Sequence, residues 1–297
     1  MKNSHSNIKK SKYLLEKNEC VGIPTETVYG LAANAYSNKA TSKIFKLKKR
    51  PKKNPLIVHY HDLHNLKKDC VINSNFKKLY KRFCPGPITF ILKLKKNNKI
   101  SKNVTNNKKT LAVRFPNHNL TIKLLKSLNF PVAAPSANIS TKISAVSKKD
   151  VEEEFGKKIK YILNGGRSKL GLESTIIDLS TRPKIIRLGA IEIEKINKIL
   201  NIKLRYSYRT KQNYPGQSKL HYSPGLPIRV NAKQARQNEA FILIGKRKIN
   251  KKNYFYLTKK KNLREAGKNL YKTLRHIKRQ NYKFISVEKI PNVGVGR

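Results

Sequence analysis

Short apolar runs recur along roughly the first 190 residues of the chain, and glycine, proline or asparagine bounds them. Each run is about as long as a β-strand and is rich in valine, isoleucine and leucine. The runs fall at residues 19–25, 54–60, 87–94, 110–116, 130–136, 160–166, 174–180 and 183–189. This pattern predicts a succession of strands.

Between these runs lie segments in which apolar residues recur at three- and four-residue spacing, which predicts amphipathic helices. The segments are 39–50, 73–83 and 120–128. Strands and helices are therefore mixed up to about Asn201. This organisation favours one α/β or α+β domain over residues 1–205, built around a sizeable sheet.

The pattern changes at residues 206–227, which hold polar residues, three prolines and two glycines without a sustained period. Such a composition is typical of a linker. Beyond it, an amphipathic helix is predicted at 262–280 and a strand at 284–290. Residues 228–297 are thus predicted to form a second, small α/β domain. The last six residues, NVGVGR, have the pattern of a glycine turn that opens a helix.

The composition is that of a soluble globular protein, with 38% hydrophobic residues and a mean hydropathy of −0.61. No apolar run approaches the roughly 18–20 residues of a membrane span, and the N-terminus lacks the apolar segment of a signal peptide. The widely spaced Cys20, Cys70 and Cys84 suit neither a disulfide framework nor a zinc site. A reducing cytoplasm is the expected location.

The formal net charge is +51, and it has two compatible explanations. Lysine and arginine neutralise phosphates, so the charge could attract RNA or polyphosphate. However, asparagine, isoleucine and tyrosine are also abundant, and an AT-rich genome enriches these residues together with lysine through codon bias alone. The charge by itself therefore does not decide the function.

One stretch stands apart from the basic background. Residues 22–37, GIPTETVYGLAANAYS, contain a single acid, Glu26, and no basic residue. Hydroxyls at Thr25, Thr27 and Tyr29 follow a predicted strand, where they could offer donors to a small polar ligand without a competing charge. The alternative is a β-turn whose threonines are satisfied locally.

Two further segments carry candidate chemistry. Lys48 and Arg50 lie where a helix gives way to a loop at Pro51, a place suited to a polyphosphate. The alternative is a solvated basic helix end. Ser136 and Asn138 follow the 130–136 run among small residues, which allow a ligand to approach the backbone. Neither a P-loop nor a strand-borne G-x-G-x-x-G motif is present, and His59, His61 and His64 are not expected to bind zinc.

Taken together and in order, nine segments resemble the Sua5/YrdC/YciO family in its long, two-domain Sua5 form. They are PTETVYGL, KKRP, NPLIVH, FCPGPITFIL, LAVRFPNH, APSANIS, GLESTIIDL, IIRLGAI and HYSPGLP. The resemblance runs from about Leu14 to the C-terminus. It implies a YrdC-like twisted mixed sheet with flanking helices, a linker that closes over the active site, and a small Rossmann-like C-terminal domain.

The resemblance also implies a reaction. Members of this kind join L-threonine, bicarbonate or CO2, and ATP into threonylcarbamoyl-adenylate and pyrophosphate, with Mg²⁺ on the ATP phosphates and no protein metal ligands. The product passes to a downstream transferase that modifies adenosine 37 of tRNAs reading ANN codons. Because no protein nucleophile is needed, catalysis should depend on positioning and charge neutralisation.

Residue by residue, the family's site maps onto this chain as follows. The residues implied to act in catalysis are Lys48, Arg50, Ser136 and Asn138. Those implied to bind threonine are Thr25, His59, Arg114, Ala134 and Ser174. Those implied to bind ATP are Lys48, Lys52, Thr110, Ser136, Ser144, Arg187 and Tyr222. Arg114 would hold the threonine carboxylate in its guanidinium fork.

The chain departs from the family at two places. Leu188 stands where proline is expected, which should loosen the turn that carries Arg187. In the family, a segment like NVGVGR continues into a final helix, so the second domain is expected to be truncated and to pack poorly.

Two other functions stay open at this level. One is a non-enzymatic RNA-binding protein that uses the positive charge, although the basic runs lack the interleaved aromatics of base-stacking surfaces. The other is a carbamoyl-transfer domain of a hydrogenase-maturation protein, which the missing cysteine-rich zinc modules disfavour.

Overall fold

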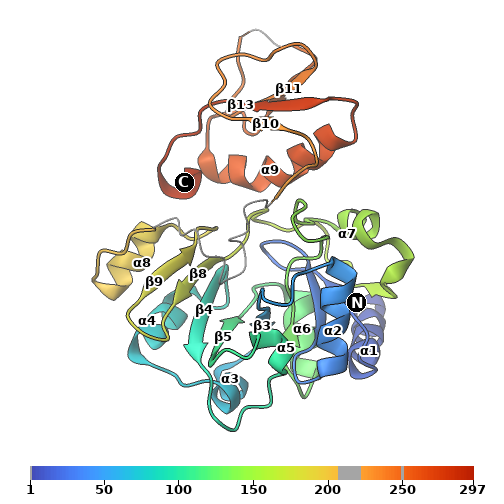
Figure 1. Cartoon of the computed structure of the whole chain (residues 1–297), viewed down its shortest axis with the longest axis vertical. Coiled ribbons are helices and arrows are strands. Elements are labelled where there is room, and N and C mark those ends of the chain that lie inside the picture. The colour runs from blue at the N-terminus through green and yellow to red at the C-terminus, as the bar shows by residue number, and fades with distance from the viewer. Residues whose placement is uncertain (1, 207–221, 249–250) are drawn as a thin grey trace.

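The computed structural model describes residues 2–206, 222–248 and 251–297. In Figure 1 the chain forms two units, with the C-terminal unit stacked on one end of the larger one. The larger unit contains a nine-stranded mixed sheet, and the smaller one contains a four-stranded sheet. No helix among the described residues is long and apolar enough to cross a membrane.

The larger unit alternates strands and helices, as the sequence predicts. Its strands are β1 (Val21–Ile23), β2 (Gly30–Asn34), β3 (Ile57–His59), β4 (Ile88–Lys93), β5 (Thr110–Arg114), β6 (Val132–Ala133), β7 (Tyr161–Ile162), β8 (Thr175–Asp178) and β9 (Lys184–Arg187). Its helices are α1 (Lys2–Glu16), α2 (Asn38–Lys48), α3 (Leu63–Asp69), α4 (Ser74–Phe83), α5 (Lys102–Thr105), α6 (Asn119–Ser127), α7 (Lys148–Phe155), the 3-10 turn η1 (Gly156–Lys158) and α8 (Ile193–Leu200).

The strands of the larger sheet are ordered β7-β1-β2-β6-β3-β5-β4-β8-β9. Parallel pairs join β1 to β7, β3 to β5 and β4 to β8, and the other pairs are antiparallel. The strands β3 and β5 lie in the middle of this order, and their register sets His59 opposite Arg114. Two residues that were predicted separately thus come to lie side by side.

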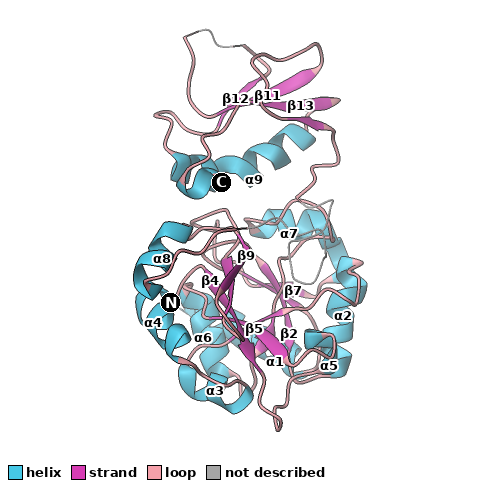
Figure 2. Cartoon of the chain, turned by 60° about the vertical axis from the view of Figure 1, so that its left-hand side comes forward, coloured by secondary structure: helices cyan, strands magenta, loops and turns pink. Residues whose placement is uncertain are grey.

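The two faces of the large sheet are covered differently, because alternate strand residues point to opposite sides. One face forms the main core with α2–α5, α7 and α8. On the other face, α1 and α6 pack against β1, β2 and β6. The rest of that second face carries a small apolar cluster made of strand residues only: Ile57, Ile91, Ala112, Ile176 and Ile186. Figure 2 shows the helices arranged around the sheet.

The smaller unit is an all-parallel sheet with one long helix beside it. Its strands are β10 (Ile228–Arg229), β11 (Glu239–Leu243), β12 (Tyr254–Tyr256) and β13 (Phe284–Val287), in the order β10-β13-β11-β12. The helix α9 (Leu263–Lys278) connects β12 to β13, and a 3-10 turn, η2 (Gly294–Gly296), ends the chain. A parallel sheet with such a crossover helix is typical of α/β folds.

The two units share an apolar core. Val28, Ile143 and Val146 of the larger unit pack in one cluster with residues of β11, α9 and β13. Every residue of β11 is buried. The expectation that the second domain packs poorly is therefore wrong for the described residues, because α9 and the larger unit together cover its sheet.

Most of the predicted elements are confirmed, including the mixed α/β fold and the parallel C-terminal sheet. Several elements were not predicted, among them α3, α5, α7, α8, β2 and α1. The strand β2, GLAAN, lacks the branched residues of the other strands, and α1 lies in a polar, lysine-containing segment. Of the predicted linker at 206–227, residues 207–221 lie outside the described residues, so its closure over a site stays a prediction.

Candidate active site

A cavity of about 50 Å³ lies on the second face of the large sheet, where β3 and β5 end, β2 and β8 begin, and the chain turns after β6. Its lining residues come from six separate stretches of sequence. They are Thr25, Val28, Tyr29, Gly30, Arg50, Pro55, Ile57, His59, Arg114, Ala134, Pro135, Ser136, Glu173, Ser174 and Arg187. The cavity therefore gathers eight of the predicted site residues.

Arg114 ends β5 and forms a buried ion pair at the cavity. Its Nη2 donates to Glu26 Oε1 over 2.7 Å, and both side chains are 6% exposed. The other carboxylate oxygen of Glu26 accepts from the backbone N–H of Asn117 at 3.0 Å. Arg114 Nε is buried and has no hydrogen-bond partner among the described residues. Glu26 thus fixes the guanidinium while one donor stays available for a ligand.

His59 lies beside Arg114 on the neighbouring strand and is 2% exposed. Burial, with the nearby Arg114 cation adding to it, lowers the pKa of His59 well below its ordinary value. The imidazole is therefore neutral at neutral pH. Its Nδ1 is buried without a partner in the described part of the chain. We call Glu26, His59 and Arg114 the paired side of the cavity.

Thr25 borders this side, and its hydroxyl closes the turn after β1. Thr25 Oγ1 donates to the carbonyl of Val28 at 2.6 Å and lies 2.9 Å from Thr27 Oγ1. The turn is thus satisfied locally, as one of the two interpretations of this stretch expected. Thr25 also lines the cavity, as the other interpretation expected. The interpretation as a locally satisfied turn is confirmed, and the contact of Thr25 with a ligand stays a prediction.

Lys48 is 1% exposed and does not line the cavity, so the alternative of a solvated helix end is wrong for this residue. Its ammonium donates to the backbone carbonyls of Ser136, at 2.6 Å, and Asn138. Burial and the Arg50 charge lower the pKa of Lys48 well below its ordinary value, while Glu173 and Glu154 act in the opposite direction. Lys48 therefore supports the cavity wall from behind.

Arg50 lies in the loop after α2, where it is half-buried and lines the cavity. It donates to two carbonyls at 3.0 Å each, those of Asn54 and Pro55. Burial and the neighbouring Arg187 cation lower the pKa of Arg50 to about 10. At neutral pH the guanidinium is still charged. We call Lys48, Arg50 and Arg187 the cationic side.

Arg50 also lines a second hollow of about 440 Å³, which we call the basic groove. The groove is lined by Ser42, Phe45, Lys46, Lys49, Arg50, Lys52, Lys102, Asn103, Asn106 and Asn107. The predicted site residue Lys52 lies here and not in the cavity. Since ligand pockets usually measure about 300–1,000 Å³, a ligand the size of a nucleotide would have to extend beyond the cavity.

Arg187 ends β9 and is held against Ser174. Its guanidinium donates to the Ser174 carbonyl at 3.1 and 2.8 Å and to Ser174 Oγ at 3.1 Å. A Cβ at Gly189 would lie 2.5 Å from the backbone of residues 173–175, so only glycine permits this close approach. The turn is therefore anchored although Leu188 replaces the expected proline.

Ser136 and Ala134 line the cavity, whereas Asn138 lies just behind it. The amide nitrogen of Asn138 donates to the carbonyls of Ile139 and Lys142, each at 2.8 Å. Its Oδ1 is buried with no partner in the described residues. Asn138 thus shapes the loop that follows Ser136.

Three predicted ATP residues lie away from the cavity lining. Thr110 shares its sheet face with Arg114, but at the other end of β5, about 13 Å away at roughly 3.3 Å per residue. Ser144 Oγ donates to Glu173 Oε1 and is 1% exposed. Tyr222 stacks on Tyr271 of α9, with ring centroids 5.4 Å apart. Their proposed contacts with ATP stay predictions.

Two acids at the site were quoted in the motifs, but sequence reasoning gave them no role. Glu26 pairs with Arg114, and Glu173 is the one acid among the described residues that line the cavity. Glu173 Oε2 also accepts from the Tyr271 hydroxyl at 2.9 Å. Both lie in segments with few other charges, PTETVYGL and GLESTIIDL, and this rarity was the available signal.

The site can therefore hold a ligand with two different ends. The paired side offers an unpaired N–H of the Arg114 guanidinium and a neutral imidazole. The cationic side offers two arginines that donate hydrogen bonds to backbone carbonyls. No nucleophile with an adjacent base is evident around this cavity in the described residues. This is the arrangement of a site that binds and positions charged substrates.

Comparisons with known proteins place the chain in a family. Residues 13–189 match the Sua5, YciO and YrdC family model, which carries the description telomere recombination. Residues 191–297 match the model of the threonylcarbamoyl-AMP synthase C-terminal domain. The chain belongs to the Sua5/YciO/YrdC family, and it has the domain pair of the long Sua5 form.

Its relatives include two curated threonylcarbamoyl-AMP synthases. The one from Pyrococcus abyssi is 35% identical over 95% of this chain and 88% of its own length. The one from Bacillus subtilis is 33% identical over the same shares of both chains. The crystal structure of P. abyssi Sua5 complexed with L-threonine superposes with a TM-score of 0.88 and 33% identity, covering 97% of this chain and 90% of that one.

Proposed function

We propose that this protein is an enzyme that makes threonylcarbamoyl-adenylate and pyrophosphate from L-threonine, bicarbonate or CO2, and ATP. The activity named for its full-length relatives and the threonine-bound P. abyssi structure support this proposal. In reaction class it would be a nucleotidyltransferase, because it transfers the adenylyl group of ATP to a carbamate oxygen.

The observation that carries the proposal is the charge distribution around one cavity. Threonine is a zwitterion, and the Glu26–Arg114 pair is neutral overall, so that side can take one carboxylate without attracting a polyanion. Arg50 and Arg187 are charged without a carboxylate hydrogen bond from the described residues, so their side suits phosphates. The two substrates would meet between these sides.

In the proposed reaction the threonine carboxylate binds the available donors of Arg114, which places its amine inside the cavity. The ammonium first loses a proton to water, the free amine nitrogen then attacks the carbon of bicarbonate, and water leaves to give a carbamate. A carbamate oxygen then attacks the α-phosphorus of ATP and expels pyrophosphate. Arg50 and Arg187 would stabilise the charge that develops on the phosphates, and Lys48 would hold the loop of Ser136 in place.

ATP is expected to bring Mg²⁺ to the site. The described residues contain no group of three acidic, histidine or cysteine side chains that could hold a metal ion. In this proposal the ion is held by the ATP phosphates and by water.

The wider role follows from the same proposal. The product, a reactive mixed anhydride, would pass to a transferase that modifies adenosine 37 of tRNAs reading ANN codons. A cytoplasmic location fits the three free cysteines, two of which are buried. The alternative of a non-enzymatic RNA-binding protein has less support, because both domains of the chain match those of the synthases.

The experiment that tests the proposal is a substrate-omission assay. Purified protein is incubated with ATP, Mg²⁺, L-threonine and bicarbonate, and pyrophosphate and the adenylate are measured. Product is expected only when all substrates are present. Serine and valine in place of threonine test the amino-acid side. Pyrophosphate release that ignores threonine and bicarbonate would contradict the proposal.

A further inference from the structure

The loop from Ser136 to Ser147 connects β6 to α7 and carries both Ser136 and Asn138 of the candidate site. It contains little regular structure of its own, so its shape depends on contacts with other parts of the chain. We call this segment the 136–147 loop.

The first half of the loop is fixed from within the larger domain. Lys48 donates to the carbonyls of Ser136 and Asn138, and its own carbonyl accepts from the N–H of Ser140 at 2.8 Å. Glu154 of α7 accepts from the N–H of Ile139 at 3.2 Å. The glutamate side chain is only 5% exposed.

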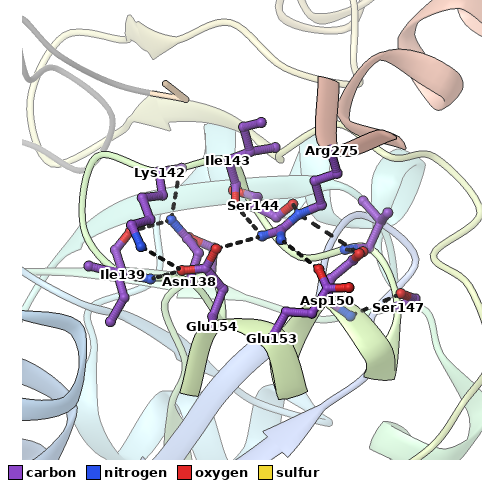
Figure 3. A network of polar contacts seen from close by, with 12 residues as sticks. Asn138, Ile139, Lys142, Ile143, Ser144, Ser147, Asp150, Glu153, Glu154 and Arg275 are labelled. Carbon is purple, nitrogen blue, oxygen red and sulfur yellow. Dashed lines mark hydrogen bonds and ion pairs between the residues drawn. The ribbon is translucent and has the colours of Figure 1, made fainter. Parts of the chain in front are cut away.

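The second half is held by the other domain (Figure 3). Arg275 of α9 donates through Nη2 to the carbonyl of Ile143 at 2.6 Å and through Nε to that of Ser144 at 3.3 Å. The same Nη2 lies 3.3 Å from Glu154 Oε1. The arginine is 5% exposed, although it is separated from the loop by about 130 residues of sequence.

Glu154 therefore joins the two halves. One carboxylate oxygen holds Ile139, next to Asn138, and the other binds the guanidinium that holds residues 143 and 144. The neighbouring Ala145 carbonyl accepts from Tyr29 N at 2.8 Å, which returns the network to the cavity lining. A guanidinium can make this set of bonds because its donors form a planar fork.

A second arginine on the same helix provides a contrast. Arg279 lies one turn further along, and its Nη2 binds Asp150 at 3.2 Å and Glu153 at 2.7 Å. Its side chain is 42% exposed, and its described polar contacts are with α7 and its own helix, not with a loop carbonyl. Arg279 thus attaches the domains without touching the loop.

From this arrangement we propose that Arg275 is a positioning residue for Ser136 and Asn138, so that the second domain sets the geometry of the 136–147 loop, whose Ser136 lines the cavity. The proposal rests on the function proposed above for its kinetic part. Its structural part, the ordering of the 136–147 loop, holds or fails independently of the reaction.

The test compares Arg275→Met with Arg279→Met in the full-length chain. Because local openings exchange faster when anchoring contacts are lost, amides of residues 139–146 should exchange at least about tenfold faster in Arg275→Met and within about twofold of wild type in Arg279→Met. With adenylate formation as readout, the KM for ATP should rise or kcat should fall about tenfold in Arg275→Met only, with the KM for threonine little changed. Arg275→Lys should recover part of both effects.

If Arg275→Met does not fold, Glu154→Gln replaces it, since it removes the charge that joins the two halves at nearly constant size. Loop amides that exchange at the wild-type rate in folded Arg275→Met, or in folded Glu154→Gln, would overturn the proposal. Equal effects of Arg275→Met and Arg279→Met would overturn it too. A wild-type protein without adenylate formation would instead defeat the proposed function, and the exchange comparison would still decide whether the loop is held.

Discussion

The paired side and the cationic side of the cavity hold their arginines by different means. Arg114 is fixed by the carboxylate of Glu26, which both orients the guanidinium and balances its charge. Arg50 and Arg187 are fixed by backbone carbonyls, which accept hydrogen bonds but carry no net charge. A carboxylate acceptor neutralises the arginine that it orients, whereas a carbonyl acceptor leaves the positive charge free to attract an anion.

This difference explains how one small cavity can separate two substrates. A polyphosphate binds more favourably on the cationic side, where no described carboxylate hydrogen-bonds the two arginines. Beside the carboxylate of Glu26 its binding is less favourable. An amino acid needs one cation for its carboxylate and would be misplaced among several. The fold achieves the separation by pairing Arg114 with Glu26 on one side and by holding Arg50 and Arg187 with backbone carbonyls on the other.

The largest expected effect comes from removing the cationic side. Lys48→Met and Arg50→Ala should each reduce adenylate formation by about 10²–10³-fold, the size of effect seen when a preorganised charge-stabilising donor is lost. Lys48→Met should also lower the free energy of unfolding by about 1–3 kcal/mol, because two buried carbonyls lose their donor. Turnover and chemical denaturation are measured, with exposed Lys39→Met on the same helix as control. Near-wild-type turnover in Arg50→Ala would refute the assignment of this side.

A smaller and more selective effect is expected on the paired side. Arg114→Lys keeps the charge but removes the fork that serves both Glu26 and a carboxylate. The KM for threonine should rise about 10- to 100-fold, which corresponds to about 1.4–2.8 kcal/mol, while the KM for ATP changes little. Steady-state kinetics with each substrate varied in turn checks this. Unchanged threonine dependence would contradict the role of Arg114.

Glu26→Gln tests whether charge balance itself matters. The amide keeps the shape and can still accept from Asn117, but Arg114 loses its counter-charge. The KM for threonine should rise about tenfold, since a tenfold change needs only about 1.4 kcal/mol of altered orientation. Selectivity should also fall, so that inorganic phosphate becomes a better competitor of threonine than it is for the wild type. Inhibition constants for phosphate in both proteins decide the matter.

The smallest effect is a dependence of ATP binding on pH. Burial and Arg50 lower the pKa of Lys48 in the free protein, and an anion bound on the cationic side should raise it again. Binding then takes up protons, so the affinity for ATP should fall as pH rises through the free-state pKa. Calorimetry in two buffers of different ionisation heat, above about pH 8 where phosphates are fully ionised, measures the uptake. Arg114→Lys should leave it unchanged, and absence of uptake would contradict this picture.

Sequence reasoning located most of the fold because its strands are apolar runs with clear boundaries. The strand β2 escaped because glycine and alanine give no β-branched signal, although Gly30 is needed where a Cβ would come within 3.2 Å of the Ala134 Cβ. The helix α1 escaped because its buried residues, such as Leu14 and Leu15, are few among lysines and asparagines. Both cases lacked a local pattern, and tertiary packing supplied the rest.

The sequence predicted many residues of the candidate site, but not the contacts that bring them together. Lys48 stands in a run of basic residues, a pattern typical of a solvated helix end. It is buried because it ends α2 beside the 136–147 loop, where its ammonium donates to the Ser136 carbonyl. The bonds of Arg275 to Ser144 and of Tyr271 to Glu173 join residues 131 and 98 positions apart. No sequence pattern predicts contacts between residues so far apart in the chain. The contacts of the second domain with the site could therefore be found only in the structure.

The helix α7 has a consequence for how the two domains recognise each other. The chain has 67 basic residues and 16 acidic ones, yet four of the acids lie within the eight residues of α7. Arg275 and Arg279 of the second domain pair with this helix, and Arg264 and Arg297 pair with Glu192 and Glu194 at α8. Because acids are scarce in this strongly cationic molecule, the few places where they gather favour one docking position of the second domain.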